Sequence, residues 1–291
     1  LNLSLSLPYE LFNMTGRMDQ VNVIVAHSLE ARPLINRFEL KPNKIEASLT
    51  VYSNDAGIRL IITGVGKQSS FAATSRLADL RENSFEEREG WLNIGIAGHK
   101  SANIGAGLLA NKIIDASSAK AVYPVPLLLD IPSSVVITVD QPDLDYCEEA
   151  AYEMEAFGFW SAVSNHTFLE LIQIYKLISD NPEHPVNQLD PNSLEQLVAN
   201  HCDKVERVVL NLQSLVREVN EIYRLPDECE KLQGKVRLSI TQQHQLKRLC
   251  QRFLALGLGK KLTEIIDEVP HTGKQLIQNL ELELLSETRI K

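Results

Sequence analysis

The chain has 291 residues, of which 44% are hydrophobic, and its formal net charge is −9. This length and composition allow one large domain, or one domain with an appendage, around a substantial core. The negative charge argues against a general nucleic-acid binder, because such proteins gather a basic face toward the phosphate backbone. No apolar run approaches the ~20 residues that a membrane span requires, so we expect no membrane interaction.

The cysteines and the N-terminal residues indicate the compartment. The four cysteines are far apart in sequence and form neither a CxxC pair nor a His/Cys ligand cluster. We interpret them as reduced, inert thiols of a cytoplasmic protein, with a disulfide or a zinc site as the lesser alternative. The segment LNLSLSLPYELF lacks a basic region and contains Pro8 and Glu10, so it is unlike a signal peptide. Residues 1–17 are expected to be a leader ahead of the first strand.

Short apolar runs alternate with helical patterns along the first two thirds of the chain. Residues 21–26 are expected to form a strand that leads through a loop into a helix. IRLIITGVGK and WLNIGIAGHK are two further strands that end in glycines, and a helix is expected after the first of them. Additional strands are expected at about 109–115, 134–139 and 168–178.

This alternation predicts an α/β fold with a mostly parallel or mixed central sheet flanked by helices. In such folds ligands bind where the strands end. The loops that begin at Ala26, Thr63, Ala97 and Ser179 are therefore the places where a site is expected.

The character of the sequence changes from Ser193 onward. SLEQ predicts a capping box with Ser193 as N-cap and Gln196 reaching back, followed by a long amphipathic helix to Ile222. RLPDE ends that helix, and two more helical patterns follow, one stopped by Gly257 and one around Leu280. We expect an α/β domain over residues 18–225 and a helical appendage over 226–291. The apolar stripes of the appendage are expected to pack on the main domain, or else to bind a protein partner or a second copy.

Two glycine-rich loops are candidate ligand loops. GVGK at 64–67 lacks the spacing of a nucleotide-phosphate loop. It is expected to be a tight turn, or a turn whose amides at Gly64 and Gly66 line a pocket for a sugar or an anion. In GIAGH at 95–99, Gly98 permits close approach of a ligand or of a neighbouring helix to the backbone. His99 is expected to be solvated.

Several carboxylates form a candidate site. Glu30 and Asp180 each follow an apolar strand, where side chains project into a ligand crevice. Glu153 and Glu155 flank Met154 inside an uncharged, aromatic-rich stretch. If residues 152–155 are extended, the two glutamates share one face, and if a helix begins there, Glu155 lies in its first turn. Taken singly, each carboxylate is more commonly a surface or capping group.

Together these segments resemble the purine nucleoside phosphorylase superfamily, and most of all its hydrolytic branch, the 5'-methylthioadenosine/S-adenosylhomocysteine nucleosidases. The resemblance covers roughly residues 20–222 and is strongest in EMEA and ISD. The segments that carry it, in the order found in that superfamily, are VNVIVAHSLEARPLINRF, IITGVGKQSSFAATSRL, LNIGIAGHKSANIGAGLLANKII, YEMEAFGF and IYKLISDN.

The resemblance implies roles for the acids. Asp180, paired with Ser179, matches the general acid that protonates N7 of the departing purine, and Glu30 matches the carboxylate that orients and deprotonates the attacking water. Cleavage of an N-glycosidic bond develops positive charge on the sugar and negative charge on the base. A site with anions near the ribose and a proton donor at the purine suits that chemistry.

The resemblance also implies a nucleoside-binding surface. Glu155 matches the glutamate that accepts hydrogen bonds from ribose hydroxyls, with Met154 against the sugar and Glu153 nearby. Ala97 and Gly98 match the loop on which the nucleoside lies. The ligand is thus expected to be a small-molecule nucleoside.

The sequence also departs from the family. Asn93, Ile94 and Ile96 supply no cationic donor where phosphorylases bind phosphate, which favours water as the nucleophile. Ile96 stands where the nucleosidases carry serine, and Lys176 stands where they carry arginine, which keeps the charge but loses the planar fork. Only 54 residues separate Gly98 from Glu153, a shorter segment than the family usually has.

These observations predict hydrolysis of the N-glycosidic bond of a purine nucleoside or thio-nucleoside, without a metal or an organic cofactor. Two alternatives stay open. One is a phosphate-dependent nucleoside phosphorylase, and the other is a non-catalytic nucleoside-binding or scaffolding protein in which the shortened segment has removed turnover.

Overall fold

The computed structural model describes residues 19–46, 49–80, 88–142, 145–185, 190–223, 227–267 and 272–288. They fall into two compact units, divided between Val219 and Asn220. The expected leader over residues 1–17 lies outside the described residues. Across the described ranges, no helix has both the length and the apolar character that a membrane crossing needs.

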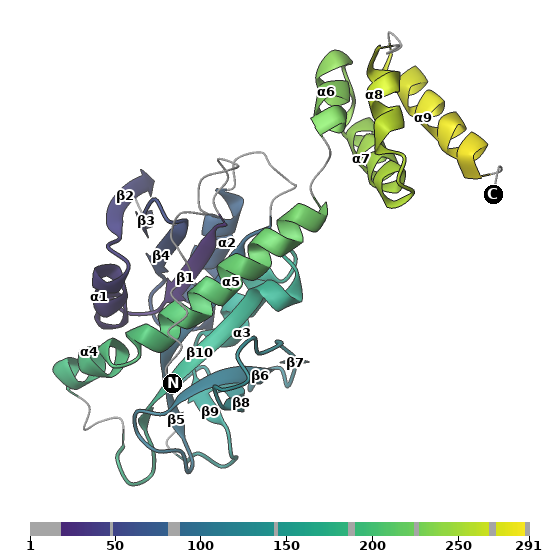
Figure 1. Cartoon of the computed structure of the whole chain (residues 1–291). Coiled ribbons are helices and arrows are strands. Elements are labelled where there is room, and N and C mark those ends of the chain that lie inside the picture. The colour runs from purple at the N-terminus through teal and green to yellow at the C-terminus, as the bar shows by residue number, and fades with distance from the viewer. Residues whose placement is uncertain are drawn as a thin grey trace, which may run out of the picture. The chain divides into compact units, whose positions relative to one another are not determined.

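The larger unit is built around one mixed sheet, to which ten strands of the described residues contribute (Figure 1). The strand order is β10-β6-β8-β9-β5-β1-β4-β3-β2, with β7 paired to β6 and β10 also paired to β5. Strands β4, β1, β5 and β10 run parallel to one another. The bounds are β1 Val21–Val25, β2 Lys41–Glu46, β3 Leu49–Ser53, β4 Ile58–Ile62, β5 Gly90–His99, β6 Gly107–Asp115, β7 Ala121–Val122, β8 Ser133–Thr138, β9 Ala151–Glu153 and β10 Ile172–Asp180.

Strand β5 changes partners along its length. On one edge its first residues pair with β1, as far as Asn93 opposite Ile24, and its last residues, Gly98 and His99, pair with β9. Its other edge pairs with β10 from Trp91 onward. The sheet therefore divides between β1 and β9, beside the middle of β5. Such a division is a topological switch point, where open α/β sheets bind their ligands.

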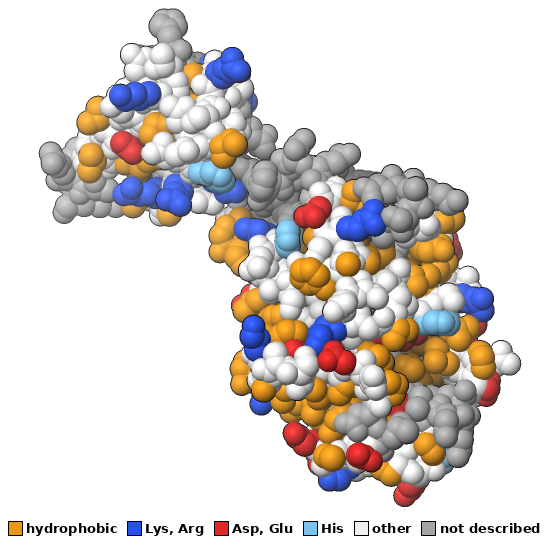
Figure 2. Space-filling view, turned by 180° about the vertical axis from the view of Figure 1, so that it is seen from behind, with side chains coloured by type: hydrophobic (Ala, Val, Ile, Leu, Met, Phe, Trp, Pro, Cys, Tyr) orange, Lys and Arg blue, Asp and Glu red, His pale blue; other side chains and the backbone are white. Residues whose placement is uncertain are grey.

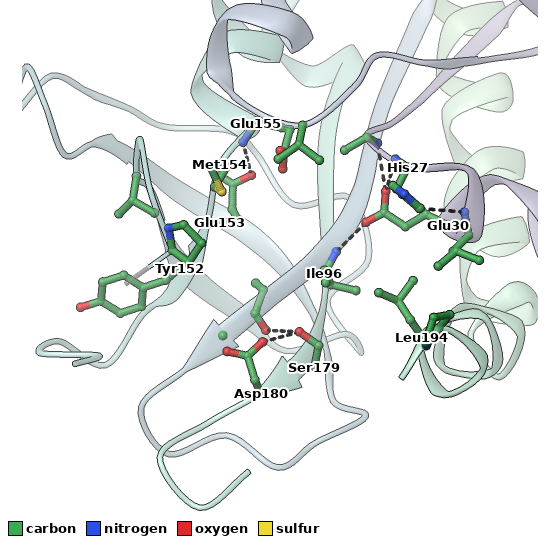
Figure 3. Close-up of a pocket in the computed structure, with 18 of the residues that line it drawn as sticks. His27, Glu30, Ile96, Tyr152, Glu153, Met154, Glu155, Ser179, Asp180 and Leu194 are labelled. Atoms are coloured by element: carbon green, nitrogen blue, oxygen red, sulfur yellow. Dashed lines mark hydrogen bonds between the residues drawn. The ribbon is translucent and has the colours of Figure 1, made fainter. Parts of the chain in front are cut away.

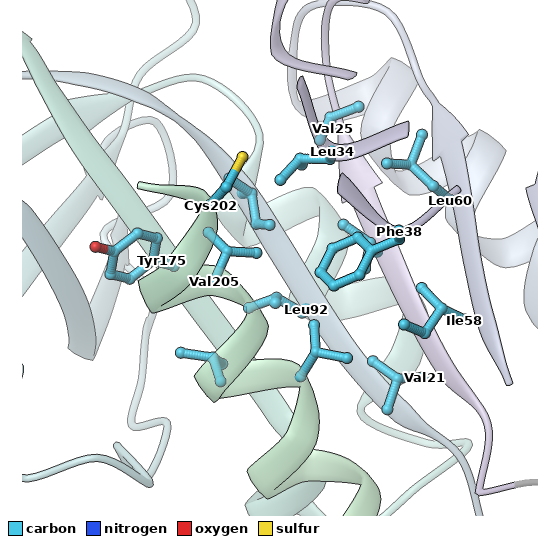
Figure 4. Close-up of a cluster of buried hydrophobic side chains, with 14 of the residues drawn as sticks. Val21, Val25, Leu34, Phe38, Ile58, Leu60, Leu92, Tyr175, Cys202 and Val205 are labelled. Carbon is cyan, nitrogen blue, oxygen red and sulfur yellow. The ribbon is translucent and has the colours of Figure 1, made fainter. Parts of the chain in front are cut away.

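Helices cover both faces of the sheet because the strand side chains alternate. Val21, Val23 and Val25 of β1 pack with helices α1, α4 and α5, whereas Ile24 packs with α2 and α3 on the opposite face. Figure 4 shows the first of these clusters, in which side chains of α1 and α5 meet those of the strands. The helix bounds are α1 Ser28–Arg37, α2 Lys67–Asp79, α3 Ala156–Val163, α4 Pro191–Ala199 and α5 Cys202–Tyr223.

The α/β fold predicted from the sequence is confirmed, and the expected strands are present with shifted ends. Strands β2, β3 and β7 were not expected; KPNKIE of β2 is polar and AV of β7 has only two residues. Of the two forms considered for residues 152–155, the extended one holds as far as Glu153, where β9 ends, and α3 begins at Ala156. On the face of the larger unit that Figure 2 shows, positive and negative side chains are interspersed.

The prediction of one long helix capped by Ser193 is wrong. The segment forms two helices, α4 and α5, separated at Asn200 and His201. The N-cap is Asp190, whose side chain accepts hydrogen bonds from the amides of Asn192 and Ser193. Pro191 at the first helical position explains the difference, because its fixed φ and missing N–H favour a helix start there.

The smaller unit consists, in its described part, of four helices around a core of its own. The bounds are α6 Asp227–Lys235, α7 Ile240–Ala255, α8 Gly259–Asp267 and α9 Gly273–Thr288. A capping box of Ser239 and Gln242 begins α7, and Gly257, with a φ of 72°, follows its end. The apolar stripes of these helices meet one another in this core. Its largest members include Leu232, Leu246, Phe253, Leu262, Leu276 and Leu280.

The interpretation of all four cysteines as reduced thiols is wrong for two of them. Cys229 of α6 and Cys250 of α7 form a disulfide within the core of the smaller unit. Cys147 is a free exposed thiol and Cys202 a free buried one. The linear spacing of the cysteines carries no sign of this pairing, because it depends on how α6 packs against α7.

Candidate active site

A cavity of about 420 Å³ lies beside the switch point of the sheet (Figure 3). Figure 3 shows Glu30, Glu155 and Asp180 approaching this cavity from different elements. Five carboxylates line it, and none of its described lining residues is Lys or Arg. They are Glu30, Glu153, Glu155, Asp180 and Asp190. Within the described ranges, no three His, Cys, Asp or Glu side chains are grouped so that they could hold a metal ion.

Glu30 lies in the first turn of α1 and is 3% exposed. Its Oε2 accepts hydrogen bonds from the amides of Ala26, at 3.0 Å, and His27, at 2.9 Å. Its Oε1 accepts one from the amide of Ile96, at 3.2 Å, in the part of β5 that faces the division of the sheet. Glu30 therefore closes the N-terminus of α1 and also joins that helix to β5.

Glu155 lies at the junction of β9 and α3 and is 7% exposed. Its Oε1 accepts a hydrogen bond of 2.7 Å from the amide of Gly66. Burial, and then the charge of Glu153, raise the pKa of Glu155 to about 7, against the opposing effect of Lys176. Its Oε2 has no hydrogen-bond partner among the described residues, so this oxygen is available to a ligand.

Glu153 is buried, at 4% exposed, and the expectation that it could simply be a surface residue is wrong. Its Oε2 accepts hydrogen bonds from the amides of Glu155, at 2.9 Å, and Ala156, at 2.8 Å, so it caps the N-terminus of α3. Its Oε1 accepts one of 2.5 Å from the hydroxyl of Thr138. Glu153 thus holds the chain in the conformation that directs Glu155 into the cavity.

Lys176 of β10 is fully buried and supplies a positive charge beneath the site. Its Nζ lies 2.8 Å from Glu153 Oε2, without the alignment of a hydrogen bond. A Cβ on Gly95 would lie 3.3 Å from both Lys176 Nζ and Glu30 Oε1. Because Gly95 has no side chain, the ammonium group of Lys176 can approach Glu30 as well as Glu153. Lys176 balances the negative charge of the cavity from below, without lining it.

Asp180, at the end of β10, is 5% exposed, and both of its carboxyl oxygens have hydroxyl partners. Oδ1 accepts a hydrogen bond of 2.5 Å from Ser179, and Oδ2 accepts one from Tyr146. A Cβ on Gly98 would lie 2.4 Å from Asp180 Oδ2 and equally close to the Tyr146 ring. Position 98 therefore admits only glycine while Asp180 and Tyr146 keep these places.

The remaining wall of the cavity is mainly apolar. Met154 lines it, as do Val65, Ile96, Val139 and Leu194. The expected ligand loop at 64–67 is a strand-to-helix turn in which Gly64 and Gly66 have φ values of 82° and 103°. The amide of Gly66 binds Glu155.

His99 is 7% exposed, so its expected solvation is wrong. Its Nδ1 accepts hydrogen bonds from the amides of Ser101 and Ala102, and burial lowers its pKa. Several residues that line the cavity were missed from sequence, among them Tyr146, Asp190 and Leu194. Tyr146 lies in an irregular segment with no motif, and Asp190 and Leu194 lie at the start of a helix that was considered only for its cap. No periodic pattern marks any of the three as a site residue.

Comparison with solved structures shows that the fold is similar to that of several nucleosidases. Three similar structures are a 5'-methylthioadenosine/S-adenosylhomocysteine nucleosidase from Helicobacter pylori, a 5'-methylthioadenosine nucleosidase from Arabidopsis thaliana and a futalosine hydrolase mutant from Helicobacter pylori. The first has 16% identity and a TM-score of 0.54, and the match covers 66% of this chain and 98% of that one. The second has 16% identity and a TM-score of 0.53, covering 67% and 97%.

The futalosine hydrolase mutant has 15% identity and a TM-score of 0.52, covering 66% of this chain and 99% of that one. The first of the three was solved with butyl-thio-DADMe-Immucillin-A. The chain matches no protein-family model and no curated protein by sequence. The similarity therefore establishes the fold alone.

Proposed function

We propose that the α/β unit is a nucleosidase that hydrolyses the N-glycosidic bond of a purine nucleoside or thio-nucleoside. The observation that carries the proposal is that Glu30, Glu155 and Asp180 line one cavity whose described wall has no Lys or Arg. The departing base leaves a sugar with cationic character, and preorganised anions stabilise such a charge far better than water does. The fold shared with nucleosidases supports the same assignment.

Glu155 is the proposed ribose-binding group. Its Oε1 is held by the amide of Gly66, while Oε2 is free to accept hydrogen bonds from ribose hydroxyls. Ionised Glu155 would also attract the positive charge that develops on the sugar. Met154 would supply an apolar contact to the ring from the adjacent wall. Glu153 contributes to ribose binding indirectly, because its hydrogen bonds to the backbone fix the direction of the Glu155 side chain.

Glu30 is the proposed base for the attacking water. A carboxylate offers about four acceptor positions, and three amides, those of Ala26, His27 and Ile96, occupy three of them. One position is left on Oε1 for a water molecule. The amides also fix the carboxylate rigidly, which keeps the water in one orientation for attack.

Asp180 is the proposed acid for the departing base, with the backbone of Ala97 and Gly98 beside it as the surface under the nucleoside. Protonation of the leaving nitrogen avoids the release of an anionic base. A positioned acid contributes about 10²–10⁴ in rate. Ser179 donates to Asp180 Oδ1 and so fixes the plane of the carboxyl group.

Water is favoured over phosphate as the nucleophile. A phosphate site needs cationic or convergent amide donors, whereas the charged side chains in the described wall of this cavity are carboxylates. The nearest buried cation, Lys176, is paired with Glu153. The expected products are therefore the free base and the free sugar.

The test is base release from a panel of purine nucleosides and 5'-thio-nucleosides, with and without phosphate. The variants are Glu30→Gln, Glu155→Gln and Asp180→Asn, with Asp130→Asn as a matched control, because Asp130 is exposed and pairs with Arg207. We expect phosphate-independent release that each cavity variant lowers by about 10²-fold or more and the control leaves unchanged. Release only with phosphate would select a phosphorylase, and binding without turnover would select the non-catalytic alternative.

The proposed reaction uses side chains of the chain and water, and we propose neither a metal nor an organic cofactor. A cytoplasmic location also stays a prediction, and the Cys229–Cys250 disulfide removes the thiol argument that favoured it. Binding of a protein partner or a second copy through α6–α9 likewise stays a prediction.

A further inference from the structure

Tyr146 lies directly against the acid of the proposed site. Its hydroxyl donates a hydrogen bond to Asp180 Oδ2, and its ring packs on Gly98. The side chain lines the cavity, although the residue is only 2% exposed. Its role is open, because no motif of the sequence includes it.

The contacts around Tyr146 hold it in one place. Its φ is 42°, a left-handed value that is uncommon for a residue other than glycine and persists only when the surroundings enforce it. The ring of Tyr152 meets the ring of Tyr146 edge to face, with 5.7 Å between the centroids. The hydroxyl of Tyr152 accepts a hydrogen bond from the amide of Glu148, which ties the same segment down.

This arrangement leaves no oxygen of Asp180 without a hydroxyl neighbour. Oδ1 is bonded to Ser179 and Oδ2 to Tyr146. A base bound within hydrogen-bond reach of Asp180 therefore lies close to at least one of these two hydroxyls as well. A phenol is a far stronger acid than an aliphatic hydroxyl, so Tyr146 is the better proton donor of the two.

We propose that Tyr146 is a catalytic residue that passes the proton of Asp180 to the departing base, an inference that rests on the proposed nucleosidase function. In this step the Tyr146 hydroxyl turns from Asp180 Oδ2 toward the leaving nitrogen and accepts a hydrogen bond from protonated Asp180. The Tyr146 O–H bond then breaks as its proton moves to the leaving nitrogen, and the proton of Asp180 moves to the phenolic oxygen. The electron pair of the C1'–N bond goes to the base. Asp180 is left as a carboxylate, and water adds to the sugar as it gives a proton to Glu30. Glu30 then releases that proton to solvent and Asp180 regains one from solvent, which restores both groups.

The test compares two leaving groups in wild-type protein and in Tyr146→Phe. One substrate is the nucleoside that the wild-type protein cleaves fastest, and the other is 4-nitrophenyl β-D-ribofuranoside, whose leaving group departs without a proton. We expect Tyr146→Phe to lower kcat on the nucleoside by about 10²-fold or more and to change kcat on the aryl riboside by no more than a few-fold. Tyr123→Phe is the control, because Tyr123 is 64% exposed and outside the cavity.

Each other outcome overturns the inference in a recognisable way. Equal loss of kcat on both substrates would mean that Tyr146 only holds the structure. The expected result includes its own check of folding, because a variant that still cleaves the aryl riboside is folded. Unchanged nucleoside cleavage would remove Tyr146 from the proton path, and faster cleavage would make it an obstruction. If the wild-type protein cleaves no nucleoside, the proposed function fails and this inference falls with it, whereas an active wild type with an equally active Tyr146→Phe contradicts the inference alone.

Discussion

The amide of Gly66 donates a 2.7 Å hydrogen bond to Glu155 Oε1 across 89 residues of sequence. This bond joins the turn before α2 to the junction of β9 and α3. Gly66 has a φ of 103°, which a residue with a side chain rarely adopts, so the turn that presents its amide depends on glycine. The bond fixes one oxygen of a buried carboxylate and leaves the other to the cavity.

The raised pKa of Glu155 predicts a pH-dependent stability. Its pKa rises from the ordinary 4.5 to about 7 in the folded protein, so the folded chain holds a proton that the unfolded chain releases between these values. The contribution of Glu155 to stability is therefore complete below about pH 4.5 and is lost progressively as the pH rises through about 7. Glu155→Gln stays neutral, and its stability relative to wild type should increase across this window.

Urea unfolding of the wild-type protein and of Glu155→Gln at several pH values checks this prediction. The other titrating groups contribute equally to both proteins, so they cancel in the difference between the two free energies of unfolding. The relative gain should reach a few kcal/mol at most. Two stability curves that run parallel from acid to alkaline pH would show that Glu155 ionises as an ordinary carboxyl group.

Lys176 is predicted to be needed for stability. Lys176→Met leaves Glu153 without its buried counter-ion, and breaking such a pair costs about 3–5 kcal/mol. Arg207→Met is the control, since Arg207 and Asp130 are both more than half exposed and a surface pair contributes at most about 1 kcal/mol. Chemical unfolding of the two variants measures both losses of stability. A similar small loss in Lys176→Met and Arg207→Met would mean that Lys176 does not compensate the buried charge of Glu153.

Gly98 is predicted to tolerate no side chain. Gly98→Ala places a Cβ 2.4 Å from both Asp180 Oδ2 and the Tyr146 ring, so these groups must move. We expect loss of activity and a destabilisation of about 1–3 kcal/mol. Gly234→Ala is a matched control in α6, where a Cβ meets nothing within 4 Å, and alanine should stabilise that helix by up to about 1 kcal/mol. Unfolding curves and base release measure both, and an active, stable Gly98→Ala would rule out this packing.

The disulfide is predicted to be detectable by alkylation. In unfolded, unreduced protein only the thiols of Cys147 and Cys202 should react, and reduction should expose Cys229 and Cys250 as well. Intact-mass measurement counts the labels. Cys250→Ser should lower the stability of the smaller unit by about 2–4 kcal/mol. Labelling of all four cysteines before reduction would show that the bond is absent.

The sequence predicted strands β1, β4, β5, β6, β8 and β10, because their apolar runs are continuous and are followed by glycines or polar residues. Glu30, Glu155 and Asp180 were singled out by the family resemblance, because each acid taken singly is more commonly a surface or capping group. The sequence did not predict Tyr146 beside Asp180, because that contact joins an irregular segment to the end of β10. The break between α4 and α5 was also missed, since the apolar spacing continues across Asn200 and His201.

In the proposed reaction, a set of buried carboxylates surrounds a sugar that becomes cationic. Titration calorimetry with a nucleoside analogue that carries a cationic pyrrolidine ring, against a neutral analogue of the same shape, tests this most directly. Above about pH 8, where Glu155 should be ionised, wild-type protein should bind the cationic analogue about 10²-fold tighter or more, and Glu155→Gln should lose most of that preference. Equal affinity of the wild-type protein for the two analogues, or binding of neither, would contradict the account.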